Sequence, residues 1–303
     1  MFDQNPEEHY IQEGDPSQPT YYIIRRMNET TDISTMYRLV MGHVRYALSK
    51  GWLPVVDMQN YPNPYLSSEK LGQENAWEYY FEQPFHVNVE TAYGGENVVL
   101  SDGDCVTPYP DYSMNLLQKK NDDLIEWRLL VKMGLMKIEP KLKKEVLKIR
   151  NNVFLPGELT LGVLLCGSDS DKRVKGQPIP PPAAFALNTV NEKFKDWECD
   201  KVILATDDKT LVEMFKNNFG ERCVSLDQIF SVCYDTAQDN SNELNSSVDT
   251  VNADFLQGKK HLMQTILLCG CNFFISERCS DATITMFSVK KFGHAIFFNF
   301  GNY

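Results

Sequence analysis

The sequence lacks a long apolar segment. None of its stretches approaches the about 18 apolar residues that a membrane-spanning helix needs, so we expect no transmembrane segment and at most peripheral contact with a membrane. The first residues, MFDQNPEE, are polar and acidic, whereas a secretory signal peptide has a basic start and then an apolar run. The sequence therefore predicts a cytoplasmic protein without a signal peptide.

Positive charge is also scarce. The 303 residues include 30 Lys and Arg against 41 Asp and Glu, which gives a formal net charge of −11. A broad surface for nucleic acid or for an anionic membrane needs dense positive charge. We therefore expect no nucleic-acid partner, although a small basic pocket for a phosphate remains compatible with this composition.

The sequence has no pattern typical of a structural metal site. Its 5 His are scattered, its 8 Cys form no CxxC pair, and no HxxxH spacing occurs, so we expect no metal. The CxC pair of Cys269 and Cys271 lies among apolar residues and predicts buried thiols. GxGxxG, Walker and GxSxG sequences are absent as well, which removes the main support for a dinucleotide-binding, P-loop or hydrolase function.

What is present is an alternation of strand and helix signals. In the first half, a strand at 21–24, an amphipathic helix at 32–49 and a strand at 53–57 form the repeating unit of a parallel sheet. In the second half, apolar runs alternate with helical periodicity, which predicts strands at 161–165, 201–205, 272–275 and 295–298 and helices at 183–196, near 211–219 and at 255–267. A chain of this length suggests two domains, and we place them at 1–150 and 151–303.

Polar residues follow three of the predicted strands in the second half. They lie in Cys166–Arg173, in Thr206–Asp208 and in Ser280–Ala282. Ligands of parallel sheets bind at the carboxyl ends of strands, and the free N–H groups of a helix start favour phosphates. A simpler explanation also exists: Thr206, Asp208, Ser280 and Asp281 can each be present as the N-cap of a helix, without a role in ligand binding.

These segments resemble a known family. The stretches LGVLLCGSDSDK, DWECDKVILATDDKTLVEMFKNNFG and FFISERCSDATITMFSVKKFGHAIFFNFGNY are similar to the three donor-site motifs of nodulation-type α1,6-fucosyltransferases and the related O-fucosyltransferase-like superfamily. The segment GWLPVVDMQNYPNPYL and the later ENAWEYYFEQP resemble the N-terminal half of a bacterial branch. The resemblance runs from about residue 35 to the last residue, 303.

The resemblance implies a GT-B-like fold in which two Rossmann-like α/β domains face a central cleft. The first domain is then the acceptor side and the second binds the nucleotide sugar. The implied activity is the inverting transfer of fucose, or a related sugar, from a GDP-sugar to a glycan hydroxyl, without an obligatory metal or another cofactor.

The resemblance also implies roles for individual residues. The expected donor-binding residues are Cys166, Gly167, Ser168, Arg173, Thr206, Asp207, Asp208, Ser280, Asp281 and Ala282. An inverting transfer needs a base near the acceptor hydroxyl, and Asp169 or Asp171 is the candidate. An alternative interpretation of Asp171 is that it is a solvent-exposed loop carboxylate without a catalytic role. In the pair Asp207–Asp208, we expect Asp208 to cap the following helix and Asp207 to face the ligand with Thr206.

The sequence departs from the family at two places. Cys166 stands where the family has an arginine on the donor diphosphate, and a thiol cannot supply a charged bidentate contact. Arg173 and Lys172, on the same loop, offer a replacement. The glycine-rich loop expected between residues 25 and 36 is not evident. Two hypotheses therefore stand: an active transferase, and a catalytically weak or inactive relative that binds a nucleotide sugar or a glycan.

Overall fold

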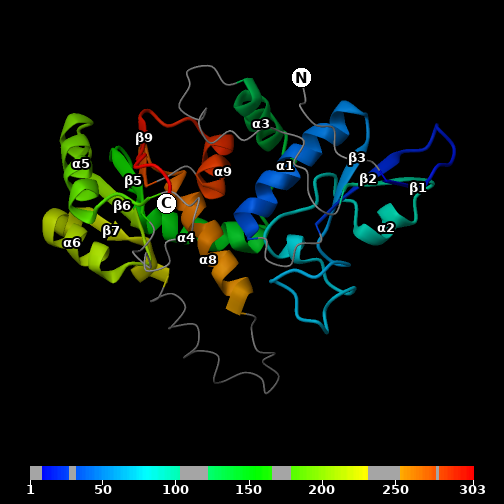
Figure 1. Ribbon diagram of the computed structural model, residues 1–303, viewed down its shortest axis with the longest axis horizontal. Coiled ribbons are helices and arrows are strands. Elements are labelled where there is room, and N and C mark those ends of the chain that lie inside the picture. The colour runs from blue at the N-terminus through cyan, green and yellow to red at the C-terminus, as the bar shows by residue number, and fades with distance from the viewer. Residues whose placement is uncertain (1–8, 27–31, 103–121, 166–178, 231–252, 278–279) are drawn as a thin grey trace. The chain divides into compact units, whose positions relative to one another are not determined.

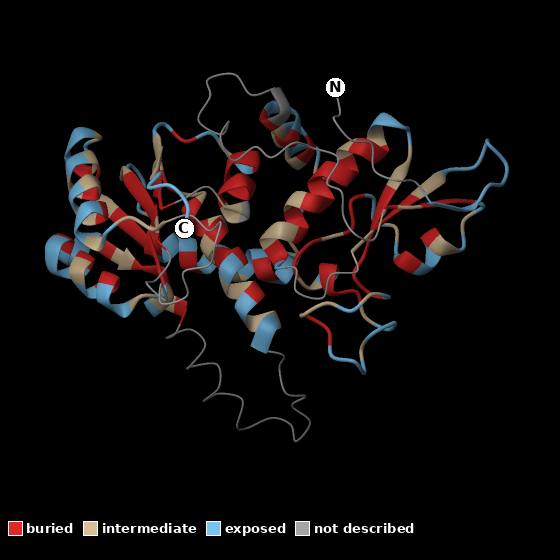
Figure 2. Cartoon of the chain, viewed as in Figure 1, coloured by how far each residue is buried: buried red, intermediate tan, exposed pale blue. Residues whose placement is uncertain are grey.

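A computed structural model of the protein describes residues 9–26, 32–102, 122–165, 179–230, 253–277 and 280–303 (Figure 1). The chain divides into two compact units. The first comprises Met1–Glu145, Val251–Leu262 and Phe287–Val289, and the second Val146–Thr250, Met263–Met286 and Lys290–Tyr303. Each unit contains one sheet, and buried residues follow the strands and the inner faces of the helices (Figure 2).

The first unit is built on a four-stranded sheet in the order β1-β4-β2-β3. Its strands are β1 (His9–Gln12), β2 (Thr20–Arg25), β3 (Leu53–Asp57) and β4 (Asn97–Leu100). β2 pairs in parallel with both β3 and β4, whereas β1 pairs antiparallel with β4. The helices of this part are α1 (Ile33–Ser49), η1 (Ala76–Tyr79), α2 (Val89–Tyr93), α3 (Asp122–Lys132) and the first turns of α4 (Pro140–Val153).

Helix α1 follows directly from its sequence. Asp32 caps the helix, because its side chain accepts hydrogen bonds from the backbone N–H groups of Ser34 and Thr35. Apolar residues at helical spacing are buried against the sheet. Gly51 follows the helix end with φ +75°, a backbone conformation that glycine adopts without strain. The predicted helix at 32–49 is thus confirmed.

Two side-chain amides complete the outer edge of β3. The Val56 N–H donates to Gln83 Oε1 at 2.9 Å, and the Val56 carbonyl accepts from Gln83 Nε2 and from Asn75 Nδ2, each at 2.8 Å. Asn75 Oδ1 accepts from the Met58 N–H at 3.2 Å. Because β3 is the last strand of the sheet, these amides stand in for a further strand and satisfy buried backbone groups.

Two later segments of the chain return to the first unit. Phe255 accepts a hydrogen bond at its carbonyl from Tyr80 Oη at 3.0 Å. Lys259 forms an ion pair with Glu145 at 2.7 Å. The Phe287 carbonyl accepts from Arg128 Nε at 2.9 Å. The units are therefore not continuous in sequence, and the expected domains 1–150 and 151–303 stay a sequence-based division.

The second unit is built on a five-stranded parallel sheet in the order β7-β6-β5-β8-β9. Its strands are β5 (Thr160–Leu164), β6 (Lys201–Ala205), β7 (Cys223–Ser225), β8 (Phe273–Ser276) and β9 (Ala295–Phe297). The helices are the last turns of α4, α5 (Ala183–Asp196), α6 (Lys209–Phe219), η2 (Gly220–Arg222), the second part of α8 (Ala253–Leu268) and most of α9 (Asp281–Val289). This alternation confirms the α/β prediction.

The middle strand β5 packs closely under α8 and the turn that follows it. A Cβ atom built on Gly162 would lie 3.1 Å from Cys271 Sγ and 3.2 Å from Leu268 Cδ2, so only glycine fits here without a shift. Leu161 and Val163 lie on the opposite face of the strand within the main apolar cluster. Both faces of β5 are thus buried, as its continuous apolar sequence predicts.

The described cysteines of the second unit are free and their thiols are unreactive. Burial raises the pKa of Cys199 and of Cys223 to about 11, and that of Cys269 and of Cys271 to about 12. Cys271 is buried, as predicted, whereas Cys269 is only half-buried. In the described ranges, no group of three or more His, Cys, Asp and Glu is placed to hold a metal ion.

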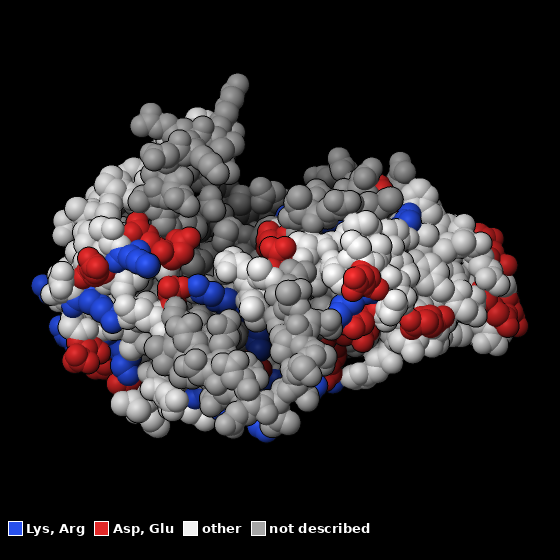
Figure 3. All heavy atoms as spheres, turned by 90° about the horizontal axis from the view of Figure 1, so that it is seen from below, with Lys and Arg blue, Asp and Glu red and all other residues white. Residues whose placement is uncertain are grey.

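Some elements differ from the sequence predictions. Between β3 and α2, residues Ala76–Tyr79 form the single turn η1. The short strands β1, β4 and β7 were not predicted. Every helix within the described ranges is too short or too polar to cross a lipid bilayer. On the face that Figure 3 shows, basic and acidic side chains of the described residues lie interspersed.

Replacing Gln83 by leucine should destabilise the protein by about 1–3 kcal/mol, because it leaves the buried N–H of Val56 without its partner. Chemical denaturation of wild type and variant measures the difference. Gln73→Leu is the matched control, since Gln73 is exposed and donates only to the Glu69 carbonyl four residues away. Equal stability of both variants would contradict the role of Gln83 at the edge of β3.

His43 should make the protein sensitive to mild acid. It is fully buried on α1, its Nδ1 lies 2.9 Å from Tyr22 Oη, and burial lowers its pKa to about 3. In the unfolded chain the histidine binds a proton near pH 6.5, whereas in the folded protein it does not. The contribution of neutral His43 to the free energy of unfolding is therefore complete above pH 6.5 and is lost as the pH falls towards 3. The free energy of unfolding should therefore already decline between pH 6.5 and 5.

His43→Phe removes the hydrogen bond with Tyr22, so the variant should be less stable at pH 7. Because the variant also lacks the titrating group, its free energy of unfolding should change less between pH 6.5 and 5. Most carboxyl groups titrate below this range, at about pH 4. His294→Phe is the control: His294 is exposed and stacks on Trp197 at 5.3 Å, and this variant should keep the wild-type slope. A His43→Phe profile as steep as that of wild type would overturn the assignment.

Candidate functional site

The sheet of the second unit brings the ends of three predicted motif strands together. β5 lies between β6 and β8, and Leu164, its last residue, is in register with Ala205 of β6 and Ser276 of β8. The pairing continues by one residue on each side, since the Leu165 N–H donates to the Ala205 carbonyl at 3.0 Å and the Glu277 N–H to the Leu164 carbonyl at 3.1 Å. The segments after these strands therefore start from one edge.

The strand order creates a switch point at this edge. From β5 the chain passes through α5 to β6 on one side, and β8 pairs with β5 on the other side. Connections that leave in opposite directions open a crevice outside the carboxyl ends of the two strands, which is where open α/β sheets bind ligands. The carboxyl ends of β5 and β8 are thus the candidate site of this unit.

The turn Thr206–Asp208 follows β6 at this edge. Asp208 Oδ1 accepts hydrogen bonds from the N–H groups of Thr210 at 2.8 Å and Leu211 at 3.3 Å, so Asp208 is the N-cap of α6, as predicted. The buried Thr206 hydroxyl accepts from the Asp208 N–H at 3.2 Å and tightens the turn. Asp207 is exposed, and its contact with a ligand stays a prediction.

The third motif forms the start of α9. The Ser280 side chain accepts from the Thr283 N–H, and the Thr283 hydroxyl accepts from the Ser280 N–H at 2.7 Å, which together make a capping box. Ala282 is half-buried in the first turn, and Asp281 is the first residue of the helix. The capping explanation of Ser280 is therefore confirmed, while donor binding by Ser280, Asp281 and Ala282 stays a prediction.

Six of the predicted site residues lie outside the described residues. They are Cys166, Gly167, Ser168, Asp169, Asp171 and Arg173. Their roles as donor-binding groups and as base remain those that the resemblance implies.

The first unit carries a polar network at the carboxyl ends of its strands that the sequence did not predict. Arg25, the last residue of β2, donates from Nε to the Ser101 carbonyl at 2.9 Å and from its guanidinium to Tyr61 Oη at 3.1 Å. Tyr93 Oη donates to the buried carboxylate of Asp57, at the end of β3, at 2.9 Å. Burial, with the hydrogen bond to Tyr61 and the nearby Asp57, raises the pKa of Tyr93.

In the sequence, the only local indication of this network is a charged residue at the end of each predicted strand of the first half: Arg25 directly follows the strand at 21–24, and Asp57 ends the strand at 53–57. Arg26, directly after β2, has a buried Nε that forms no hydrogen bond within the described part of the chain. An arginine carries its charge at every physiological pH. The carboxyl edge of the first sheet therefore holds two arginines, of which Arg25 is engaged with Ser101 and Tyr61.

A pocket of about 350 Å³ lies next to this edge, beyond β3. It is mainly polar and is lined by Gln59, Gln73, Glu74, Asn75, Glu78, Tyr79, Asn88, Val89 and Glu90. A hydrogen bond from Tyr79 lowers the pKa of Glu74, and one from Gln59 lowers that of Glu90. Ionised carboxylates and amides accept hydrogen bonds from hydroxyl groups, so the pocket suits a hydroxyl-rich ligand and disfavours an anion.

Two α/β units, each with a parallel core of strands and a switch point, define a GT-B-like protein, as the sequence predicted. Solved fucosyltransferases have a similar fold. The selenomethionine form of fucosyltransferase NodZ from Bradyrhizobium is 14% identical with a TM-score of 0.52, over 93% of this chain and 96% of that one. NodZ α1,6-fucosyltransferase soaked with GDP-fucose is 13% identical with a TM-score of 0.50, over 89% and 91%.

The O-fucosyltransferase POFUT1 in complex with GDP is 8% identical over 94% of this chain and 99% of that one, with a TM-score of 0.49. No family model matches the sequence, and no curated protein matches it. The likeness predicted from the motifs is therefore confirmed at the level of the fold, over most of the chain.

The two aspartates after β6 should respond differently to substitution. Asp208→Ala removes the cap of α6 and should lower the stability by about 0.5–2 kcal/mol, whereas Asp207→Ala should leave it nearly unchanged. Thermal unfolding of both variants measures this. In the same variants, nucleotide affinity should fall for Asp207→Ala and persist for Asp208→Ala. If both variants lose stability and neither loses nucleotide affinity, the turn Thr206–Asp208 has only a structural role.

Proposed function

We propose that the protein is a glycosyltransferase that transfers fucose, or a related sugar, from a GDP-sugar to a glycan hydroxyl. The observation that carries this proposal is the meeting of three motif strands at the switch point beside β5, in a fold that resembles a fucosyltransferase soaked with GDP-fucose. We further propose that the transfer inverts the sugar's configuration and that no obligatory metal takes part.

The donor is held at the carboxyl edge of the second sheet in this proposal. The 11-residue α6 and the 9-residue α9 begin there, and helix N-termini attract phosphate groups. Asp208 and Ser280 already cap these helices, so the charge for the leaving diphosphate comes from Arg173 and Lys172 on the loop after β5. Asp169 or Asp171, on the same loop, accepts the proton of the acceptor hydroxyl.

The acceptor is held by the first unit. The 350 Å³ pocket offers the carboxylates of Glu74 and Glu90 beside the amide groups of Gln73 and Asn88. These groups recognise sugar hydroxyls by accepting and donating hydrogen bonds. The alternative, a relative that binds a nucleotide sugar or a glycan without transfer, is favoured by two features of the sequence, the cysteine at position 166 and the lack of an evident glycine-rich loop between residues 25 and 36.

A thermal-shift series with GDP, UDP, ADP and CMP tests the donor. GDP should raise the melting temperature most, since a ligand at about 100 times its Kd stabilises the native state by about 2.7 kcal/mol. Incubation with GDP-fucose and candidate glycans then tests the transfer through release of GDP and the anomeric configuration of the product. GDP binding without transfer to any glycan supports the non-catalytic alternative.

Two variants locate the diphosphate contact. Cys166→Arg should tighten GDP binding if the lost arginine weakens the site, because an arginine–phosphate pair adds charge-assisted hydrogen bonds. If Arg173 replaces it, Cys166→Arg should have no effect and Arg173→Ala should abolish binding. Calorimetry distinguishes these results. Absence of GDP binding by wild type and by both variants would reject a GDP-sugar donor.

A further inference from the structure

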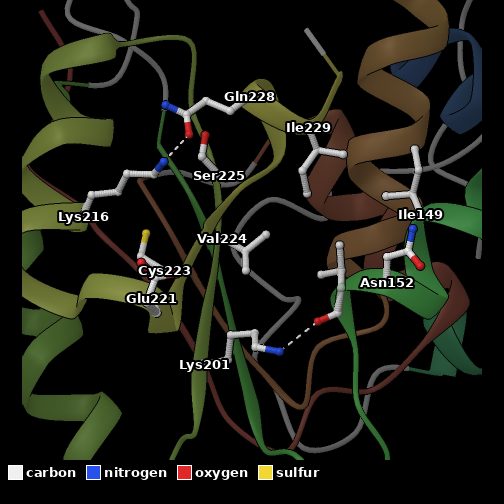
Figure 4. A pocket seen from close by; sticks show the side chains of 11 residues that line it. Ile149, Asn152, Lys201, Lys216, Glu221, Cys223, Val224, Ser225, Gln228 and Ile229 are labelled. Carbon is white, nitrogen blue, oxygen red and sulfur yellow. Dashed lines mark hydrogen bonds between the residues drawn. The ribbon is translucent and has the colours of Figure 1, made fainter. Parts of the chain in front are cut away.

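A second cavity lies along β7, the edge strand of the second sheet (Figure 4). Its volume is about 590 Å³, within the range of about 300–1,000 Å³ that is typical of small-molecule sites. Its walls come from α4, from β7 with the residues around it, and from Lys216 of α6. The proposed donor site lies at the ends of β5, β6 and β8, so this cavity is a separate feature of the same unit.

A buried hydroxyl group in this cavity has no partner. Ser225, the last residue of β7, is 3% exposed, and its Oγ forms no hydrogen bond within the described residues. A buried polar group left unsatisfied raises the free energy of the folded state. A ligand that hydrogen-bonds to Ser225 Oγ would recover that free energy, which makes this hydroxyl an anchor point.

Hydrogen-bond donors surround the anchor point. Lys216 Nζ donates to Gln228 Oε1, and Figure 4 shows Ser225 beside this pair. An ammonium group has three N–H bonds, so Lys216 retains donors for a ligand. The hydrogen bond to Gln228 holds the Lys216 ammonium beside Ser225, and this end of the cavity therefore suits an acceptor with negative charge.

The charged group beside Ser225 is the ammonium of Lys216, whereas Glu221, the acidic residue of the lining, lies beside Cys223 in Figure 4. The other lysine of the cavity, Lys201, is already neutralised, since its ammonium pairs with Glu158 at 2.6 Å and donates to the Val153 carbonyl at 3.0 Å. Figure 4 shows Lys201 away from Gln228, towards the opposite end. The buried thiol of Cys223 keeps its proton, because burial raises its pKa to about 11. One unneutralised cation matches a monoanion better than a diphosphate.

Most of the remaining lining is apolar, apart from the amide of Asn152 and the carboxylate of Glu221. Ile149 and Val153 of α4 are buried, and Val224 and Ile229 contribute from β7 and the segment after it. In Figure 4 the side chains of Val224 and Ile229 lie between the Ser225 end and Ile149 of α4. Apolar surface that is removed from water contributes about 25 cal/mol per Å², so this region binds the apolar body of a ligand.

We propose that this cavity binds a small carboxylic acid with an apolar body, as its carboxylate. The carboxylate accepts hydrogen bonds from Ser225 Oγ and Lys216 Nζ, and the apolar body lies against Ile149, Val153, Val224 and Ile229. The site does not depend on the proposed transferase function, since none of these residues is among the expected donor-binding or catalytic residues, although Lys216 lies within the motif stretch 196–220.

The test uses two probes with the same apolar body: 2-naphthoate and its neutral counterpart 2-naphthalenemethanol. Calorimetry with the full-length protein should show naphthoate binding at least about tenfold tighter, because only the anion forms charge-assisted hydrogen bonds. Lys216→Gln should remove most of this preference. Lys209→Gln, at an exposed position of the same helix outside the cavity, should retain it.

Ser225→Ala provides an independent readout. Without a probe, its melting temperature should equal or exceed that of wild type, because an unsatisfied hydroxyl is removed, whereas its affinity for naphthoate should fall several-fold. GDP binding should be unchanged in Ser225→Ala and Lys216→Gln, so this result is separate from the test of the donor site. No binding of either probe, equal binding of both, or a preference that survives Lys216→Gln would overturn the proposal.

Discussion

The parallel pairing of β5 with β6 and β8 is the interaction on which the second unit depends. Leu164 is in register with both neighbours, and this single alignment brings the three motif segments to one edge. The alignment holds because β5 is buried on both faces, and Gly162 allows Cys271 and Leu268 to approach its backbone. A larger residue at Gly162 would therefore disturb the candidate site without touching it.

The edge strands β3 and β7 differ in what lies along their outer sides. In the first unit, Gln83 and Asn75 satisfy the outer backbone groups of β3 and close that edge. In the second unit, β7 has only three residues, and a cavity with an unsatisfied hydroxyl lies along it. Exposed strand edges attract other groups. A closed edge thus serves stability, while the open one leaves room for a ligand.

Helix capping accounts for part of the motif residues. Asp208 and Ser280 each satisfy free N–H groups at the start of a helix, so their presence in the sequence is explained by stability alone. Thr206 braces the same turn as Asp208. Their capping role therefore does not by itself argue for a ligand at this edge of the sheet.

The sequence by itself determined the features that depend on near neighbours. The helix that starts at Asp32, the apolar strands β5 and β6 and the Asp208 cap all follow from residues within a few positions, where periodicity and local hydrogen bonds act. The motifs also indicated the fold. Only the tertiary structure revealed β4 and β7, the Arg25 network, the Gln83 contact with β3 and the cavity at Ser225. Each of these depends on groups brought together from distant parts of the chain, such as Arg25 and Ser101, and no local pattern encodes such a contact.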